Sequence, residues 1–171
     1  MMDAQEDAAV KASRSGLHLA QLNVGRLVAT PEDPKLKGFM DNLERVNAIA
    51  ERSPGFVWRL IGASPETGAT DLTLPGDDTM AVNLSVWESA EALEDFVWNT
   101  VHKQFYNRKA EWFTPMTEAH FVMWWIPEGH RPTLQEARDR LEYLRTHGSS
   151  AYAFGWESLP NIQAWRSQRC A

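Results

Sequence analysis

The segment MAVNLSVW (80–87) constrains the fold most, because its two faces differ in chemistry. Side chains alternate along an extended chain, so one face carries three aliphatic residues and the other carries an amide, a hydroxyl and an indole. The two sets are Val82, Leu84 and Val86, and Asn83, Ser85 and Trp87. A strand face against solvent does not need an indole, and a face packed tightly against helices usually carries aliphatic residues. We expect the second face to border a cavity; the alternative is a structural hydrogen-bond network.

The rest of the chain has the pattern of alternating strands and helices. Strands are predicted at 17–25, 55–62, 80–87 and 119–127, and helices at 34–52, 90–112 and 134–147. The second helix is expected to break near Asn99 and Thr100, and the third begins with a capping box from Thr133 to Glu136. A long loop is predicted at 63–79, and a short edge strand at 151–156.

The order β-α-β-β-α-β, followed by an extra C-terminal helix, predicts an α+β fold of the ferredoxin-like class. This class has a four-stranded antiparallel sheet with helices on one face. The other face would then be bare and apolar, and an exposed apolar sheet is an association surface. We therefore predict a homodimer through the open sheet face, in which two sheets close into a dimeric α/β barrel.

Composition excludes several classes of partner. The net charge is −6 and the pI about 5.4, which argues against a nucleic-acid surface. No run of 18 apolar residues predicts a membrane span, and a single cysteine, Cys170, suits a reducing compartment. These features predict a cytoplasmic protein. Residues 1–16 are polar and expected to be disordered, 17–156 form one domain, and 157–171 form a tail.

Several polar residues lie in predicted strands and helices whose other residues have the apolar pattern of buried segments. Asn23, with Gln21 on the same face, could orient a ligand carbonyl or an oxyanion, or could cap the end of the strand. Arg59 could anchor an anionic group, or pair with an acid across the sheet or at the dimer interface. His102 has Tyr106 at i+4 and could move a proton, ligate haem iron, or bond a backbone carbonyl.

Other site chemistries have no support in the sequence. No Cys and His residues have zinc spacing, no glycine-rich loop follows a strand as a phosphate cradle, and no serine lies in a nucleophile elbow. We expect no metal or nucleotide cofactor.

The segments HLAQLNVGR, GFVWRL, NLSVWES and WWIPEGHRPT, with EWF and AF, together resemble a bacterial family of unknown function in the dimeric α/β-barrel superfamily. The resemblance covers residues 17–156 and implies the fold and the dimer, but no established reaction. The superfamily includes cofactor-free monooxygenases and haem-degrading enzymes, whose sites lie between sheet and helices. The haem degraders place an Asn, a Trp and a His where this chain has Asn23, Trp87 and His102.

The resemblance therefore implies a cofactor-free enzyme, of oxygenase or isomerase type, acting on a hydrophobic or aromatic substrate. His102 would be the acid or base, Trp87 would stack on the substrate, and the polar residues that bind it would be Asn23, Arg59, Asn83, Ser85 and Tyr106. The alternatives are a haem-binding protein with His102 as axial ligand, and a non-catalytic binding or structural dimer. The loop at 63–79 and the third helix depart from the haem-degrader pattern.

Overall fold

The computed structural model describes residues 14–61, 73–74 and 76–159, apart from the side chains of 101, 102 and 105. Its strands are β1 (Leu17–Leu27), β2 (Phe56–Arg59), β3 (Thr73–Leu74), β4 (Asp77–Trp87), β5 (Phe113–Thr114) and β6 (Phe121–Pro127). Its helices are α2 (Lys37–Arg52), α3 (Ala90–Asn99), α4 (Val101–Asn107), α5 (Lys109–Trp112) and α6 (Leu134–His147), with short 3-10 turns η1 (Pro34–Leu36) and η2 (Trp156–Ser158).

The sheet has the strand order of the predicted ferredoxin-like fold. Its four main strands run β2-β4-β1-β6, and each pairs antiparallel with its neighbour. β1 and β4 are therefore the central strands, and Leu19 lies opposite Trp87 in their register. The short strands β3 and β5 extend the ladder at the far ends of β4 and β1. The α+β prediction is confirmed.

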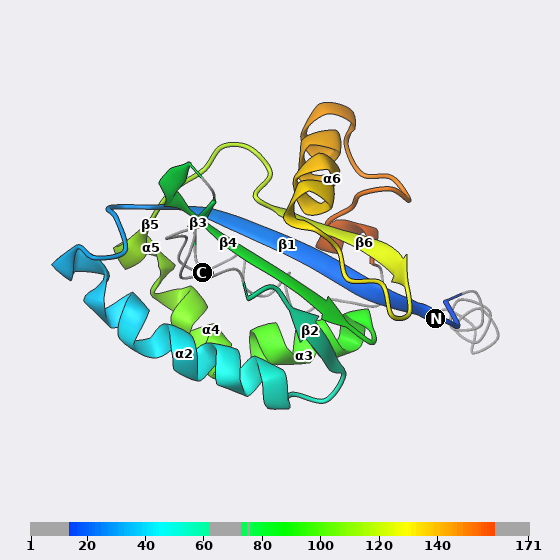
Figure 1. Ribbon diagram of the computed structural model, residues 1–171, viewed down its shortest axis with the longest axis horizontal. Helices are drawn as coiled ribbons and strands as arrows, with labels where there is room; N and C mark the ends of the chain where they lie inside the picture. Colours follow the sequence, from blue (N-terminus) through cyan, green and yellow to red (C-terminus); the bar gives the residue numbers. More distant parts are fainter. Residues whose placement is uncertain (1–13, 62–72, 75, 160–171) are drawn as a thin grey trace.

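The helices of the β-α-β-β-α-β unit lie on one face of the sheet, as predicted, but the other face is not bare, because the extra C-terminal helix α6 covers part of it. In Figure 1, α6 lies on one side of the sheet, and α2, α3 and α4 lie on the other. Ala137 and Leu141 of α6 belong to the same buried cluster as the aliphatic residues of β1, β4 and β6. The reason is the apolar stripe of α6, which needs a partner surface and finds it within its own chain. We call this side of the sheet the α6 face and the opposite side the α2 face.

The capping box predicted for α6 forms in part. The Thr133 side chain accepts a hydrogen bond from the Glu136 backbone N–H at 3.1 Å. The Glu136 carboxylate, however, accepts from Trp124 Nε1 at 3.1 Å and lies 2.8 Å from His130 Nε2. These contacts tie the first turn of α6 to β6. Trp124 lies in the core of the α6 face, whereas Trp125 packs near Phe154 on the α2 face, as alternation predicts.

Three local predictions need correction or refinement. Part of the predicted 63–79 loop forms β3 and the start of β4, while 62–72 and 75 lie outside the described residues. The predicted strand at 151–156 makes only an isolated bridge between Met123 and Phe154. The predicted break in the second helix occurs at Thr100, whose backbone is extended and whose hydroxyl donates to the Phe96 carbonyl.

The apolar core on the α2 face is divided into two clusters. One contains Leu19 and Trp87 with residues of α2 and α3, including Val46, Ala50 and Phe96. The other lies toward the opposite end of β1 and contains Leu27, Leu36, Phe39, Ala81 and Trp112. We call them the Trp87 cluster and the Trp112 cluster. The residues of β1 and β4 between them are polar, and these residues form the candidate site.

Candidate functional site

Four polar side chains occupy the middle of the α2 face. They are Gln21 and Asn23 of β1 and Asn83 and Ser85 of β4. The antiparallel register places Asn23 directly opposite Asn83, and Gln21 directly opposite Ser85. The four residues therefore form one continuous patch across the two central strands, which we call the polar strip.

The polar strip is open to solvent at its centre. Asn23 and Asn83 are exposed, although they lie on central strands of a sheet with helices on this face. The flanking positions Leu19 and Trp87 at one end, and Leu27 at the other, are buried in the two apolar clusters. On α2, Asn47 falls between Leu43 of the Trp112 cluster and Ala50 of the Trp87 cluster. The helix thus carries a polar residue at the level where the two clusters part.

A chain of hydrogen bonds runs along the strip. Trp87 Nε1 donates to Ser85 Oγ at 2.9 Å. Gln21 Nε2 donates to the same Ser85 Oγ and to Asn83 Oδ1, both at 2.7 Å. Gln21 and Ser85 are only 4% and 5% exposed, so these bonds form in a poorly hydrated environment. The predicted alternative, a hydrogen-bonded network on this face, is therefore present, but it ends at an exposed amide.

The network leaves hydrogen-bond donors at the open end of the strip. The Asn83 oxygen is already used by Gln21, and its Nδ2 has no partner among the described residues. Ser85 Oγ accepts from two N–H groups, so its own hydrogen remains to be donated. Asn23 makes no side-chain hydrogen bond within the described part of the chain. The exposed amides of Asn83 and Asn23 can therefore donate to oxygen atoms of a ligand, while the Ser85 hydrogen lies at a buried position.

Trp87 has a different role from the one predicted. Its side chain is 1% exposed and stacks on Phe96, with the ring centroids 5.2 Å apart. Phe56 packs edge-on against the same indole at 5.4 Å. These neighbours leave the indole no exposed face on which a substrate could stack. Trp87 instead anchors the hydrogen-bond chain through its N–H, and the stacking prediction is corrected.

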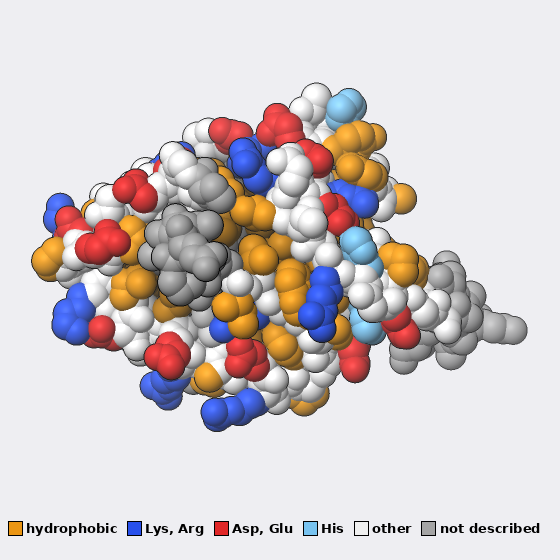
Figure 2. Space-filling model, in the orientation of Figure 1, with side chains coloured by type: hydrophobic (Ala, Val, Ile, Leu, Met, Phe, Trp, Pro, Cys, Tyr) orange, Lys and Arg blue, Asp and Glu red, His pale blue; other side chains and the backbone are white. Residues whose placement is uncertain are grey.

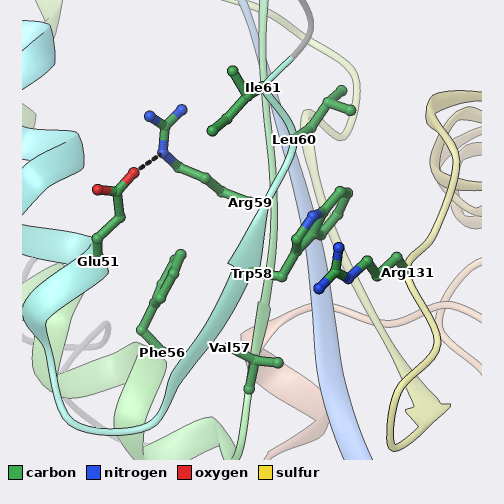
Figure 3. A pocket seen from close by; sticks show the side chains of 8 residues that line it. All are labelled: Glu51, Phe56, Val57, Trp58, Arg59, Leu60, Ile61 and Arg131. Carbon is green, nitrogen blue, oxygen red and sulfur yellow. Dashed lines mark hydrogen bonds and ion pairs between the residues drawn. The ribbon is translucent and has the colours of Figure 1, made fainter.

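Arg59 lies at the sheet edge and is already paired. Its Nε donates to Glu51 Oε1 at 2.7 Å, so Arg59 pairs with an acid, but this acid lies on α2 rather than across the sheet or at a dimer interface. The same edge is lined by a shallow hollow of about 410 Å³ that wraps around β2 (Figure 3). In Figure 3, Arg59 and Phe56 point toward α2, while Trp58 and Arg131 lie on the other side of the strand. The hollow therefore lies at the exposed edge of the sheet; none of the four residues of the polar strip lines it, although Arg59 is opposite Ser85 in the register of β2 and β4.

Of the two predicted residues of α4, only Tyr106 has a side chain that can be described. The backbone at His102 belongs to α4, but its side chain lies outside the described part, so the roles as acid, base or haem ligand stay predictions. Tyr106 packs edge-on against Trp98 at 5.1 Å, and its hydroxyl accepts from Lys109 Nζ at 2.9 Å. The Tyr106 hydroxyl is thus engaged on the surface of the helix.

Two ion pairs among the described residues shift the pKa of a carboxyl group. Arg26 donates to Asp77 at 2.9 and 3.0 Å and lowers the pKa of that carboxyl, and the Arg108 guanidinium lowers the pKa of Glu111. Both pairs are solvent-exposed and act as local surface contacts. Among the described residues, no group of three or more His, Cys, Asp or Glu side chains could hold a metal ion. No described helix is both long enough and apolar enough to span a bilayer.

Residues 18–170 match the family described as domain of unknown function DUF3291. The chain belongs to this family. Comparison of the DUF3291 chain with curated proteins gives no match.

Among solved structures, the DUF3291 chain is similar to a conserved protein from Methanosarcina mazei Go1. The TM-score is 0.45 at 13% identity, over 68% of this chain and 97% of that one. It is also similar to SnoaB, a cofactor-independent oxygenase from Streptomyces nogalater. Here the TM-score is 0.42 at 17% identity, over 68% of this chain and 96% of that one.

Gln21 is the residue of the DUF3291 site whose importance the sequence understates. Alternation places it on the face of Asn23, and this much was predicted. Its bonds to Asn83 and Ser85 join residues that are 62 and 64 positions apart in the chain. Such contacts depend on the register of β1 against β4. The available signal was a glutamine in a strand fit for burial, two residues before an asparagine on the same face.

Proposed function

We propose that this DUF3291 protein binds a hydrophobic, aromatic or conjugated molecule on the polar strip and converts it without a bound cofactor. One observation carries the proposal: Asn23 and Asn83 are exposed opposite each other on the two central strands, between two buried apolar clusters. An opening with apolar walls and a few converging polar groups is the usual form of a small-molecule site.

The side chains of the strip suit a ligand with a carbonyl or phenolic oxygen. Asn83 Nδ2 and the Ser85 hydroxyl are donors that could bind such an oxygen, and Asn23 offers a second amide facing Asn83. Donors held in place by a buried network stabilise a developing oxyanion without reorganising. A substrate that forms an enolate or phenolate would gain most from this arrangement.

The proposed reaction is oxygenation, or isomerisation of an activated carbon acid. Both begin by removing a proton, from the carbon next to a carbonyl group or from a phenolic hydroxyl, and the anion that forms is stabilised at oxygen. In the isomerisation the proton returns to a different carbon; in the oxygenation the anion is oxidised by molecular oxygen, of which one atom enters the substrate as a new carbonyl oxygen and the other leaves as water. In this proposal His102 is the acid or base, and Asn23, Asn83 and Ser85 orient the substrate. This assignment follows the resemblance to cofactor-free enzymes of the dimeric α/β-barrel superfamily.

Replacing Asn83 by alanine tests the binding proposal. The probe is 1-indanone, an aromatic ketone whose only polar atom accepts hydrogen bonds. Loss of one donor should weaken its binding about tenfold, the equivalent of one hydrogen bond of ordinary strength. The control is Asn99→Ala, at an exposed amide on α3 that bonds Asp95. Isothermal titration of the two variants should separate them, and equal affinities would contradict a role for Asn83.

We also propose that the protein forms a homodimer through the part of the α6 face that α6 leaves uncovered. Trp58 and Leu60 of this part are only partly buried, and the adjoining Val57 and Ile61 are 38% and 63% exposed. In Figure 2 hydrophobic side chains gather near the middle of the view, where β2 lies. A second copy covering this patch would remove apolar surface from water.

Leu60→Glu is expected to convert the dimer into a monomer, because Leu60 lies with Trp58 on the α6 face and a carboxylate there would be buried in the apolar patch. Val28→Glu is the control, since Val28 is an exposed aliphatic residue, 42% accessible, that lies beyond the end of β1. Sedimentation velocity on the two variants reports the change. A wild-type monomer at all concentrations would rule out the dimer.

A further inference from the structure

We infer that Gln21 is a positioning residue that fixes the Asn83 amide with its NH2 group toward the ligand, and so makes the strip selective for hydrogen-bond acceptors. The inference rests on the proposed function, in that it takes the polar strip to be the binding site. It goes further by naming the kind of atom the site accepts: a carbonyl, enolate or phenolate oxygen.

The geometry around Gln21 carries this inference. Its Nε2 is 2.7 Å from Asn83 Oδ1 and 2.7 Å from Ser85 Oγ, so both amide hydrogens have an acceptor. Because Gln21 offers a donor at this point, Asn83 must turn its oxygen toward Gln21. The Asn83 NH2 group then lies at the other end of the amide, on the exposed side of the strip.

The opposite arrangement of the amides satisfies fewer buried donors. If the Gln21 amide were turned over, its oxygen could accept from Asn83 and from the Ser85 hydroxyl. The two Gln21 N–H groups would then lose the acceptors they now have, in a side chain that is only 4% exposed. Buried N–H groups without acceptors are rarer and more costly than carbonyl oxygens with unused lone pairs. The observed orientation is therefore the favoured one.

Trp87 favours the same arrangement of hydrogen-bond donors and acceptors. Its indole N–H can only donate, and it donates to Ser85 Oγ. Ser85 thus receives donors from both sides and keeps its own hydrogen for a third partner. Trp87 and Gln21 both donate to Ser85, and Gln21 also donates to Asn83, so Ser85 and Asn83 each keep N–H or O–H hydrogens for a further partner. At Asn83 and Ser85, a ligand that presents only N–H groups therefore meets donors.

The inference predicts a reversal of ligand preference in Gln21→Glu. A carboxylate only accepts, so Asn83 should turn its NH2 group toward position 21 and present its oxygen to the ligand. The probes are 1-indanone, which only accepts, and indole, a bicycle of similar size that only donates. Wild type should prefer 1-indanone by about tenfold, as expected for one hydrogen bond against none. Gln21→Glu should prefer indole, and Gln21→Leu should show little preference.

A second measurement separates failure of this inference from failure of the proposed function. In protein labelled with ¹⁵N asparagine, the Asn83 side-chain protons should exchange rapidly with solvent in wild type and slowly in Gln21→Glu. If neither probe binds wild type but the exchange rates change as described, the positioning role stands and the ligand site is wrong. If the exchange rates and the probe preference are unchanged in both Gln21 variants, the inference is overturned.

Discussion

Replacing Leu141 by alanine is expected to lower the free energy of unfolding by about 2 to 5 kcal/mol, the range for truncating a buried leucine. Leu141 is 4% exposed and lies in the cluster formed by α6 and the α6 face of the sheet. The loss combines the transfer free energy of the removed atoms with the cavity left between helix and strands. Urea unfolding at equilibrium, with the midpoint and slope fitted together, measures it.

Arg138→Ala is the matched control for this change. Arg138 is exposed on the same helix, and alanine is a slightly better helix former, so its unfolding free energy should stay within about 0.5 kcal/mol of wild type. If Leu141→Ala were as stable as Arg138→Ala, α6 would not be packed on the sheet. The whole α6 face would then be open, as the sequence pattern suggested.

Replacing Ser85 by alanine is expected to destabilise the protein by about 1 to 3 kcal/mol, the cost of leaving buried donors without an acceptor. The Trp87 indole N–H loses its partner, and Gln21 loses one of two acceptors. Alanine fits the space of serine, so packing should change little. The measured loss therefore reports the hydrogen-bond network rather than the volume of the side chain.

A double-mutant cycle with Trp87→Phe isolates the Trp87–Ser85 bond. Phenylalanine removes the indole N–H, so Ser85→Ala should cost less in that background than in wild type. The same cost in both backgrounds would show that the indole does not depend on Ser85. Trp87→Phe also shortens an aromatic side chain that is packed against Phe96, so its own effect on stability mixes packing with hydrogen bonding. The informative quantity is therefore the coupling free energy from the cycle.

Much of the fold follows from local patterns. Alternation assigned Asn83, Ser85 and Trp87 to one face of β4, and the order of elements predicted the sheet topology that is observed. The capping residue Thr133 placed the start of α6. These predictions succeed because the physical causes lie within a few residues of one another in the chain.

The side on which α6 lies depends on contacts that no local pattern specifies. The apolar stripe of α6 shows that the helix must pack on something. It does not distinguish the bare face of its own sheet from another surface. The bare face, once covered in part by α6, leaves a smaller area for a second molecule than the sequence pattern implied.

The prediction that Asn23, Asn83 and Ser85 share one face of the sheet is confirmed by the register of β1 against β4, while their role in binding a ligand stays a prediction. The network that joins them depends on the register between β1 and β4, and the burial of Trp87 depends on Phe96 from a following helix. Both are tertiary effects. For this reason the sequence predicted which residues meet but misassigned what Trp87 does.

The most direct measurement is a crystal structure of the full chain soaked with 1-indanone. We expect the ketone oxygen within hydrogen-bond distance of Asn83 Nδ2, with the aromatic ring lying over the strip between the Trp87 and Trp112 clusters. Density for the ketone only at the β2 edge, or an Asn23–Asn83 surface that stays filled with water at saturating ketone, would contradict the assignment of the polar strip as the binding site.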